Sequence, residues 1–294
     1  GYSVFPTVFH VEWNNKKLNI IDCPGSDDFI GGAITALNVT DQAVILINGQ
    51  YGPEVGTQNN FRYTEKLHKP VIFLINQLDS DKCDFDNVMV NMNAIYGSKC
   101  VQIQYPVSTG AGFNAIVDVL LMKMYTWGPE GGMPTIVDIP AEEMDKAMEL
   151  HKLLVEAAAE NDETLMEKFF EEGELSREEI ISGLNNGILG GDITPVCCCA
   201  AQPNIGVCTL MDNLVKYMPP ASMAKAPKAV NPKTGDAVEV KQDGKFAAQV
   251  IKTVIDQFGK YSILKVYSGV LSADVAPYNT REEKSEKPSA PGIM

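Results

Sequence analysis

The sequence has no long apolar run and few basic residues, and both absences narrow its function. No stretch approaches the roughly 18 apolar residues of a membrane-spanning helix, so we expect no transmembrane segment. Lys and Arg total 24 against 38 Asp and Glu, which gives a formal net charge of -14. Because phosphate neutralisation requires basic residues, this balance disfavours nucleic-acid binding through bulk charge. We therefore predict no membrane or DNA partner, and only local contacts with any RNA.

The seven cysteines include no C-x-x-C pair. Cys197, Cys198 and Cys199 are contiguous, and neighbouring residues of a strand point to opposite faces. Three such thiols cannot easily bind one tetrahedral zinc ion. We interpret them as small buried apolar residues in a reducing compartment, with metal or redox use as the alternative.

The first part of the chain alternates between strand and helix patterns. The 294 residues are 45% hydrophobic, which is an ordinary globular composition with room for two domains. The predicted elements are a hairpin of Thr7–Trp13 and Leu18–Asp22, helices Phe29–Val39, Thr57–His68 and Phe85–Tyr96, and buried strands Ala43–Asn48 and Pro70–Asn76. This alternation predicts a parallel, doubly wound α/β sheet.

The alternation is interrupted after Gly97 and resumes near residue 194. The interrupting elements are predicted strands Val101–Val107 and Ala115–Trp127 and predicted helices Ala141–Glu160, Glu163–Phe170 and Ser176–Leu184. The segment from Asp138 to Glu179 is strongly acidic, with 15 acids and four bases. We interpret residues 98–190 as an insertion subdomain. Strand Thr194–Cys199 and helix Gly206–Tyr217 then complete an α/β domain over residues 1–219.

A second unit is predicted to follow. Residues 220–239 are rich in Ala, Lys and Pro and are typical of a linker. Two long strands, Lys245–Ile255 and Lys260–Leu271, flank a turn at Phe258-Gly259. We interpret residues 240–294 as the start of a β domain that ends before the domain closes.

Two short motifs are predicted to lie at the carboxyl ends of strands. In Asp22-Cys23-Pro24-Gly25, the carboxylate can hold Mg²⁺, usually through water, and Gly25 lets a backbone N–H approach a phosphate oxygen. In Asn76-Gln77-Leu78-Asp79, the carboxylate can accept two hydrogen bonds from guanine and the Asn amide can read the base's acceptor edge. Each motif alone is typical of ordinary turns, but ligands of open α/β sheets bind where both are expected.

With these motifs, the sequence resembles elongation factor G, a bacterial translational GTPase. Asp22–Gly25 resembles its D-x-P-G motif and Asn76–Asp79 its N-K-x-D guanine motif. Val196–Ala201, followed by Asn204-Ile205-Gly206-Val207, resembles the base-binding loop of the last G motif. This resemblance implies that Cys199, Ala200 and Ala201 contact the guanine base. Gly1-Tyr2-Ser3 resembles the end of the first switch, which places Ser3 where a Thr holds Mg²⁺.

The resemblance extends over most of the chain and implies a fold and a function. The acidic insertion resembles the extra subdomain of that family, and Phe246–Gly269 resembles the first strands of its second domain, a β-barrel. The implied fold is a partial P-loop-type GTPase G domain with an α+β insertion, followed by part of a β-barrel. GTP or GDP with Mg²⁺ is the implied cofactor. The implied partners are the ribosome, including rRNA and the stalk protein, in the cytoplasm.

Several positions depart from the family pattern. The phosphate-binding G-x-x-x-x-G-K-[ST] loop is absent, and in the family it precedes the position of Gly1 together with a central strand of the sheet. Ser26 stands at the position of the catalytic His, Gln77 replaces a Lys, and Ala200 replaces a Ser. We therefore expect weak or no GTP binding by this chain alone, since most phosphate contacts are missing. Loss of the central strand is expected to leave two facing strand edges unpaired.

Because Ser is too short and too weakly basic to orient water as His does, we predict impaired hydrolysis and a divergent paralogue of elongation factor G. Whether the parent protein is an active GTPase stays open at this point. A nucleotide-independent ribosome-binding pseudo-GTPase and a ribosomal protection protein are the alternatives.

Overall fold

A four-stranded parallel sheet forms the centre of the molecule. The computed structural model describes residues 3–224, 227, 229–231, 234–257 and 259–293. The strands of this sheet are β3 (Ala43–Asn48), β4 (Val71–Asn76), β10 (Thr194–Cys198) and β5 (Cys100–Gln102), in that order. All neighbouring pairs are parallel. The predicted parallel α/β sheet is confirmed, and it includes β5 from the range expected to belong to the insertion.

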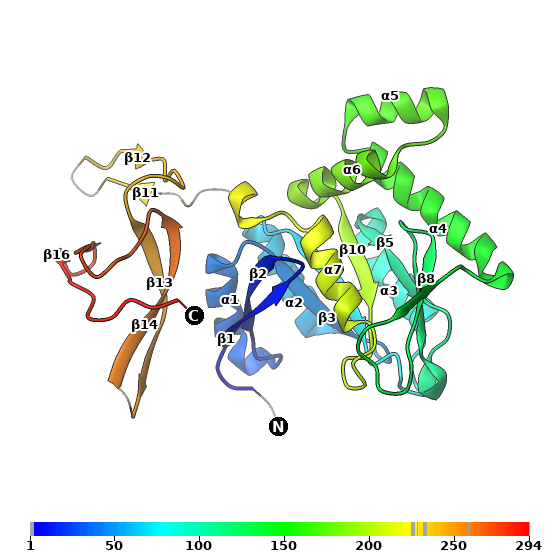
Figure 1. The fold of residues 1–294 in the computed structure, drawn as a ribbon, viewed down its shortest axis with the longest axis horizontal. Helices are drawn as coiled ribbons and strands as arrows, with labels where there is room; N and C mark the ends of the chain where they lie inside the picture. Colours follow the sequence, from blue (N-terminus) through cyan, green and yellow to red (C-terminus); the bar gives the residue numbers. More distant parts are fainter. Residues whose placement is uncertain (1–2, 225–226, 228, 232–233, 258, 294) are drawn as a thin grey trace.

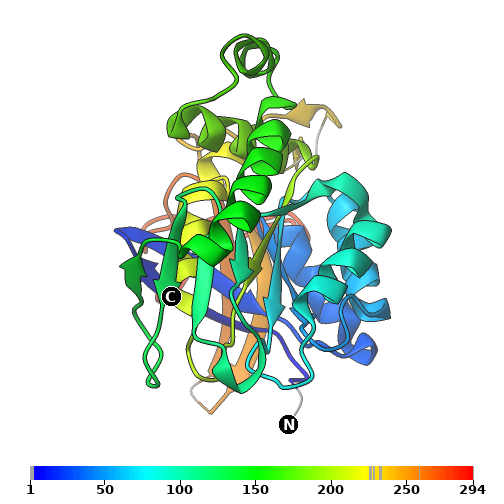
Figure 2. The same ribbon diagram turned by 90° about the vertical axis from the view of Figure 1, so that its right-hand side faces the viewer.

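Helices cover this sheet, as Figures 1 and 2 show. They are α2 (Val55–Lys66), α3 (Phe85–Tyr96) and α7 (Val207–Tyr217), while α1 (Ile30–Val39) packs against α2. Short 3-10 turns are η1 (Asp27–Phe29), η2 (Gly97–Lys99), η3 (Gly110–Gly112) and η4 (Ala221–Met223). Three aromatic rings join two of the helices to β4. Phe61 of α2 stacks on Phe73 of β4 at 5.3 Å, and Tyr96 of α3 lies 4.9 Å from Phe73. Burial of these rings fixes the helices against the sheet.

The insertion combines a second sheet with three helices. Its antiparallel strands are β6 (Gln104–Pro106), β7 (Ala115–Asp118), β8 (Lys123–Thr126) and β9 (Thr135–Val137), and its helices are α4 (Ala141–Ala159), α5 (Glu163–Glu172) and α6 (Arg177–Gly190). Each of the two long strands predicted here is therefore two short strands. At Ile103 the chain passes between the sheets, since its N–H donates to Val196 O of β10 and its carbonyl accepts from Val119 N.

Helix α6 continues past the predicted end at Leu184 because its glycines allow close packing. A Cβ on Gly183 would lie 2.3 Å from the carbonyl oxygen of Ala158 in α4. A Cβ on Gly187 would lie 2.6 Å from the side chain of Ile193. The glycines that weaken an isolated helix thus permit the contact that stabilises this one.

The remaining strands form separate two-stranded sheets. They are β1 (Thr7–Trp13) with β2 (Lys16–Asp22), β11 (Ala229–Val230) with β12 (Ala237–Val238), β13 (Ala247–Asp256) with β14 (Gly259–Ser268), and β15 (Tyr278–Asn279) with β16 (Lys284–Ser285). The β13–β14 hairpin lies to one side of the α/β body in Figure 1, where β13 contacts α1. The hairpin β1–β2 and the hairpin β13–β14 were both predicted, although Phe258 of the expected turn lies outside the described residues. None of the described helices has the length and apolar character needed to cross a membrane.

Candidate nucleotide site

Asn76, at the end of β4, ties two chain segments together. Its Oδ1 accepts hydrogen bonds from the backbone N–H of Ala201 at 3.0 Å and of Gln77 at 2.7 Å. The thiol of Cys199 lies 3.4 Å from the same oxygen. The strands β4 and β10 are parallel neighbours, so their carboxyl ends meet at one edge of the sheet. The structure thus brings the predicted Asn76–Asp79 motif and the predicted 199–201 segment together.

Residues 199–206, which we call the base loop, form a closed turn after β10. The N–H of Ala200 donates to Ile205 O at 2.9 Å, and the N–H of Ile205 donates to Ala200 O at 3.0 Å. Gly206 has a φ of +82°, and a Cβ there would lie 2.9 Å from the carbonyl oxygen of Cys198. The turn is therefore held from within, and Ala200 takes part through its backbone.

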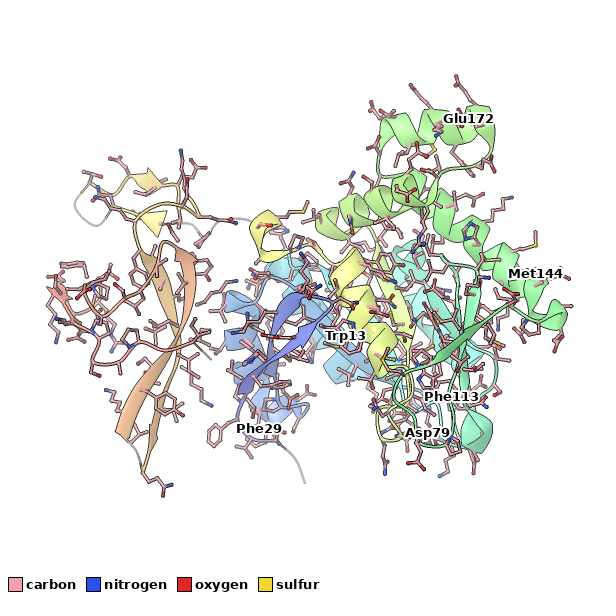
Figure 3. The ribbon with its side chains drawn as sticks, in the orientation of Figure 1. Trp13, Phe29, Asp79, Phe113, Met144 and Glu172 are labelled. Atoms are coloured by element: carbon pink, nitrogen blue, oxygen red, sulfur yellow. The ribbon has the colours of Figure 1, made fainter. Side chains whose placement is uncertain are left out.

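Asp79 lies beside the base loop at the end of the molecule that Figure 3 shows below α7. Burial, followed by the charge of Asp79, raises the pKa of the Cys199 thiol to about 12. Burial also raises the pKa of Cys83 to about 11, with the charges of Asp84 and Asp79 adding to the effect. Both thiols are therefore neutral at pH 7, so neither adds a negative charge beside Asp79.

Gln77 is held by a residue that the sequence did not single out. Its side-chain Oε1 accepts a hydrogen bond of 2.8 Å from Nδ2 of Asn48, at the end of β3. Gln77 has a φ of +67°, in the left-handed region. Asn48 also accepts from the N–H of Gln50 at 2.8 Å. The sequence did contain a signal for Asn48, because it is a polar residue at the end of a buried strand. The carboxyl ends of neighbouring parallel strands share one edge of the sheet, so a polar residue there is a candidate for the site.

The predicted phosphate segment, Asp22–Gly25, begins at the last residue of β2 and leads through Ser26 into η1 and α1. Asp22 and Gly25 are exposed, Pro24 is buried, and the backbone of Ser26 caps η1 by accepting from Phe29 N at 2.9 Å. A Cβ on Gly25 would meet nothing within 4 Å, so packing within the chain does not require a glycine there. Burial raises the pKa of Cys23, and the neighbouring Asp22 adds to the effect. Among the described residues, no hydrogen bond joins this segment to the Asn76–Asp79 motif.

Ser3 lies at the same end of the β1–β2 hairpin as this segment. The antiparallel register pairs Thr7 with Asp22, and Ser3 precedes Thr7 by four residues. Ser3 is exposed, while Gly1 and Tyr2 lie outside the described residues. The roles of Ser3 and Asp22 toward Mg²⁺ remain predictions.

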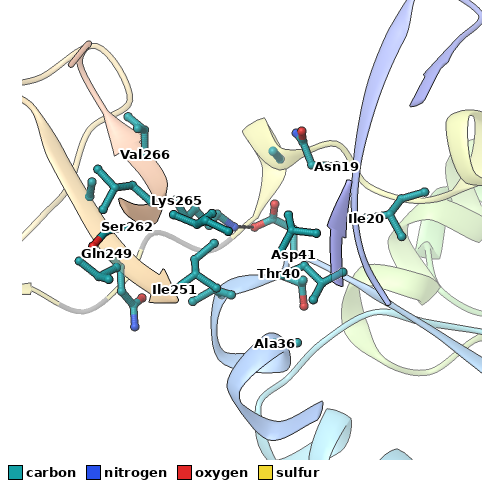
Figure 4. Close-up of a pocket in the computed structure, with 18 of the residues that line it drawn as sticks. Asn19, Ile20, Ala36, Thr40, Asp41, Gln249, Ile251, Ser262, Lys265 and Val266 are labelled. Carbon is teal, nitrogen blue, oxygen red and sulfur yellow. Dashed lines mark hydrogen bonds and ion pairs between the residues drawn. The ribbon is translucent and has the colours of Figure 1, made fainter. Parts of the chain in front are cut away.

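A large, open cavity lies between the phosphate segment and the large sheet. It has a volume of about 3600 Å³ and is lined by residues of β2, β3, α1 and α7 and by the β13–β14 hairpin. In the described part of the chain, β2 pairs only with β1 and β3 only with β4, so the expected unpaired edges are confirmed. Figure 4 shows the wall of this cavity near β2. It also shows the ion pair of Lys265 with Asp41, which joins β14 to the loop after α1.

The described residues bring too few ligands together to hold a metal ion without phosphate groups. Across the described ranges, no group of three or more His, Cys, Asp or Glu side chains gathers around one point. Mg²⁺ keeps several waters and usually takes one or two carboxylates plus phosphate oxygens, so Asp22 suffices only when phosphates are present. The open space at Gly25 is compatible with a close phosphate group.

Comparison with solved structures finds the same fold in another protein. A crystal structure of a protein from Thermus thermophilus superposes with a TM-score of 0.80 at 23% sequence identity. The match covers 94% of this chain and 39% of that one, so this chain spans about two fifths of the length of the matched protein. At this identity the likeness establishes the fold.

The family comparison covers the α/β body together with its insertion. The family model described as the elongation factor Tu GTP-binding domain matches residues 1–220, which include the base loop and both strand-end motifs. The chain therefore belongs to the family of elongation factor Tu GTP-binding domains.

Proposed function

We propose that this protein is a ribosome-associated translational GTPase of the elongation factor G type, which binds guanine nucleotide at the edge formed by β4 and β10. The observation that carries the proposal is the double attachment of Asn76, whose Oδ1 holds both Gln77 N and Ala201 N. Through these two hydrogen bonds, the motif that ends at Asp79 and the base loop lie together at one edge of the sheet. A carboxylate there accepts from N1 and N2 of guanine, and adenine would leave these polar groups unpaired.

The cavity between β2 and β3 supports a further part of the proposal. Two unpaired strand edges that face the same cavity are a template for a further strand. We propose that in the whole protein a parallel strand fills this cavity and leads into a phosphate-binding loop. That loop would supply the backbone N–H groups and the Lys that the phosphates need. Asp22 would hold Mg²⁺ through water, and Gly25 would approach the terminal phosphate.

Ser26 is the proposed cause of slow hydrolysis. It opens the 3-10 turn before α1, and its hydroxyl makes no capping hydrogen bond there. A hydroxyl on one carbon reaches less far than an imidazole and is a much weaker base at pH 7. The proposed enzyme thus binds GTP and turns it over slowly.

The nucleotide proposal is tested by titrating fluorescent GDP and ADP against the whole protein with Mg²⁺ present. We expect saturable GDP binding and at least a hundredfold weaker ADP binding, because adenine leaves the Asp79 carboxylate without two donors. Equal affinity for both nucleotides, or no binding of either, would contradict the proposal.

One observation favours a nucleotide-independent ribosome-binding function as the second candidate. The side chain of Gln77, at the family's Lys position, already has a partner in Asn48 at 2.8 Å. A side chain engaged in this way is not available to pack over a nucleotide. Under this alternative the whole protein binds ribosomes equally well with GDP, with a non-hydrolysable GTP analogue and without nucleotide.

The acidic helices of the insertion are the proposed docking surface for the ribosomal stalk protein. Figure 3 places Glu172 of α5 at the end of the molecule opposite Asp79. Glu142 and Glu143 lie in the first turn of α4, and exposed Met148, Leu153 and Phe170 add apolar area on α4 and α5. Acidic side chains around apolar ones suit a basic protein partner, since opposed potentials raise association rates.

Reversing the charges at Glu142, Glu143 and Asp145 to Lys is expected to slow association with stalk-bearing ribosomes. Electrostatic steering raises on-rates by roughly 10-fold or more at low salt, so we expect a loss of about that size that shrinks as salt is added. Stopped-flow rates with stalk-depleted ribosomes provide the control and should be equal for both proteins. Equal rates with stalk-bearing ribosomes at low salt would refute this surface.

A further inference from the structure

A loop of the insertion lies directly against the base loop. Residues 128–132, which we call the brace loop, connect β8 to β9. The N–H of Gly132 donates to the carbonyl oxygen of Asn204 in the base loop at 2.8 Å. The carbonyl oxygen of Gly132 accepts from the indole Nε1 of Trp127 at 2.8 Å, and the Cys208 thiol of α7 lies 3.2 Å from it. Trp127 is 5% exposed, so this donor is fixed by burial.

Gly131 brings the two loops closer than any other residue would allow. A Cβ at this position would lie 1.9 Å from the carbonyl oxygen of Pro203 and 2.9 Å from that of Asn204. Its φ of +63° is also in the left-handed region, which favours glycine. A side chain here must displace the backbone of the base loop, because both neighbouring atoms are main-chain oxygens.

The contact continues to the predicted nucleotide site through consecutive hydrogen bonds. Asn204, held by the brace loop, donates its N–H to Ala201 O at 3.1 Å. Ala201 donates its N–H to Oδ1 of Asn76 at 3.0 Å. The path from Trp127 to Asn76 therefore runs through backbone groups of both loops.

We propose that the brace loop positions the base loop, so that Trp127 and Gly131 are positioning residues for the guanine base although neither lies in the nucleotide site itself. This inference rests on the proposed function, since it assigns a role within the same site. It makes the insertion a support of the binding site, because the brace loop connects two strands of the insertion, β8 and β9.

The test compares Gly131→Ala with Gly128→Ala in the whole protein. Gly128 lies in the same loop, and a Cβ there would meet nothing within 4 Å, so it is a matched control. The first measurement is hydrogen exchange without nucleotide at four amides of the base loop, which are those of Ala200, Ala201, Asn204 and Ile205. Their hydrogen bonds are internal to the base loop or reach Asn76. We expect about tenfold or faster exchange in Gly131→Ala and wild-type rates in Gly128→Ala.

The second measurement is GDP affinity, which we expect to fall about tenfold or more in Gly131→Ala and to stay within about twofold in Gly128→Ala. Trp127→Phe keeps a buried ring and removes the indole N–H, and it should show the same two changes to a smaller degree. If Gly131→Ala does not fold, the same two measurements on Trp127→Phe test the proposal.

The two proposals fail in different ways. Absence of GDP binding by the wild-type protein would refute the proposed function, while the exchange rates would still report on the brace. Unchanged exchange in both Gly131→Ala and Trp127→Phe would overturn the inference. So would faster exchange with unchanged GDP affinity, since the brace would then be structural only.

Discussion

Replacing Asp79 with Asn is expected to convert a guanine site into a xanthine site. The carboxylate offers two acceptors to N1–H and N2–H of guanine, whereas an amide offers one acceptor and one donor. Xanthine carries an oxygen in place of the guanine amino group, so the amide donor gains a partner. Hydrogen bonds to a charged group contribute about 1.5–3 kcal/mol each, so losing the matched pair should weaken GDP binding about a hundredfold or more.

Titration of labelled GDP and XDP against wild type and Asp79→Asn measures this exchange of preference. Asp86→Asn is a suitable control, because Asp86 is an exposed carboxylate in the first turn of α3, where it pairs with Lys146. We expect its GDP and XDP affinities to match those of wild type. A preference for GDP that survives in Asp79→Asn would show that Asp79 does not face the base.

Helix α3 illustrates what local sequence determines. Asp84 caps its start by accepting from Asn87 N at 3.0 Å, and Gly97 follows its end with a φ of +70°. Both signals lie within a few residues of the helix, so the predicted bounds Phe85–Tyr96 match the structure. The segment from Val101 to Val107 gave no such signal. Its passage between two sheets at Ile103 depends on Val119, just past β7, and on Val196 of β10, which follows only after the whole insertion.

The sequence indicated which segments form the candidate site, but not the hydrogen bonds and close contacts that join them. The Asn76–Asp79 motif and the 199–201 segment were both predicted to bind the base. The hydrogen bond of Asn76 with Ala201 joins residues 125 positions apart, and no periodicity reveals it. The approach of Gly131 to Pro203 was equally hidden, because a glycine in a loop is usually explained by the loop itself.

The second large effect is expected at Ser26. Substituting His there in the whole protein should raise ribosome-stimulated GTP hydrolysis, because an imidazole extends further toward an attacking water and accepts hydrogen bonds more strongly at pH 7. Groups that position water or accept its proton contribute roughly 10²–10⁴-fold. Space permits the change, since Ser26 is only partly buried and its hydroxyl makes no capping bond.

Phosphate release in the presence of ribosomes, measured for wild type, Ser26→His and Ser26→Asn, separates chemistry from side-chain size. Asn lengthens the side chain without providing a base, so we expect it to hydrolyse GTP at the wild-type rate, whereas Ser26→His gains at least about a hundredfold. Equal GDP affinities of the three proteins would place the gain in the catalytic step, because Ser26 follows the phosphate segment and lies outside the base loop. If the wild-type protein already hydrolyses GTP as fast as an ordinary elongation factor, Ser26 does not limit the reaction, and the proposal of slow turnover is wrong.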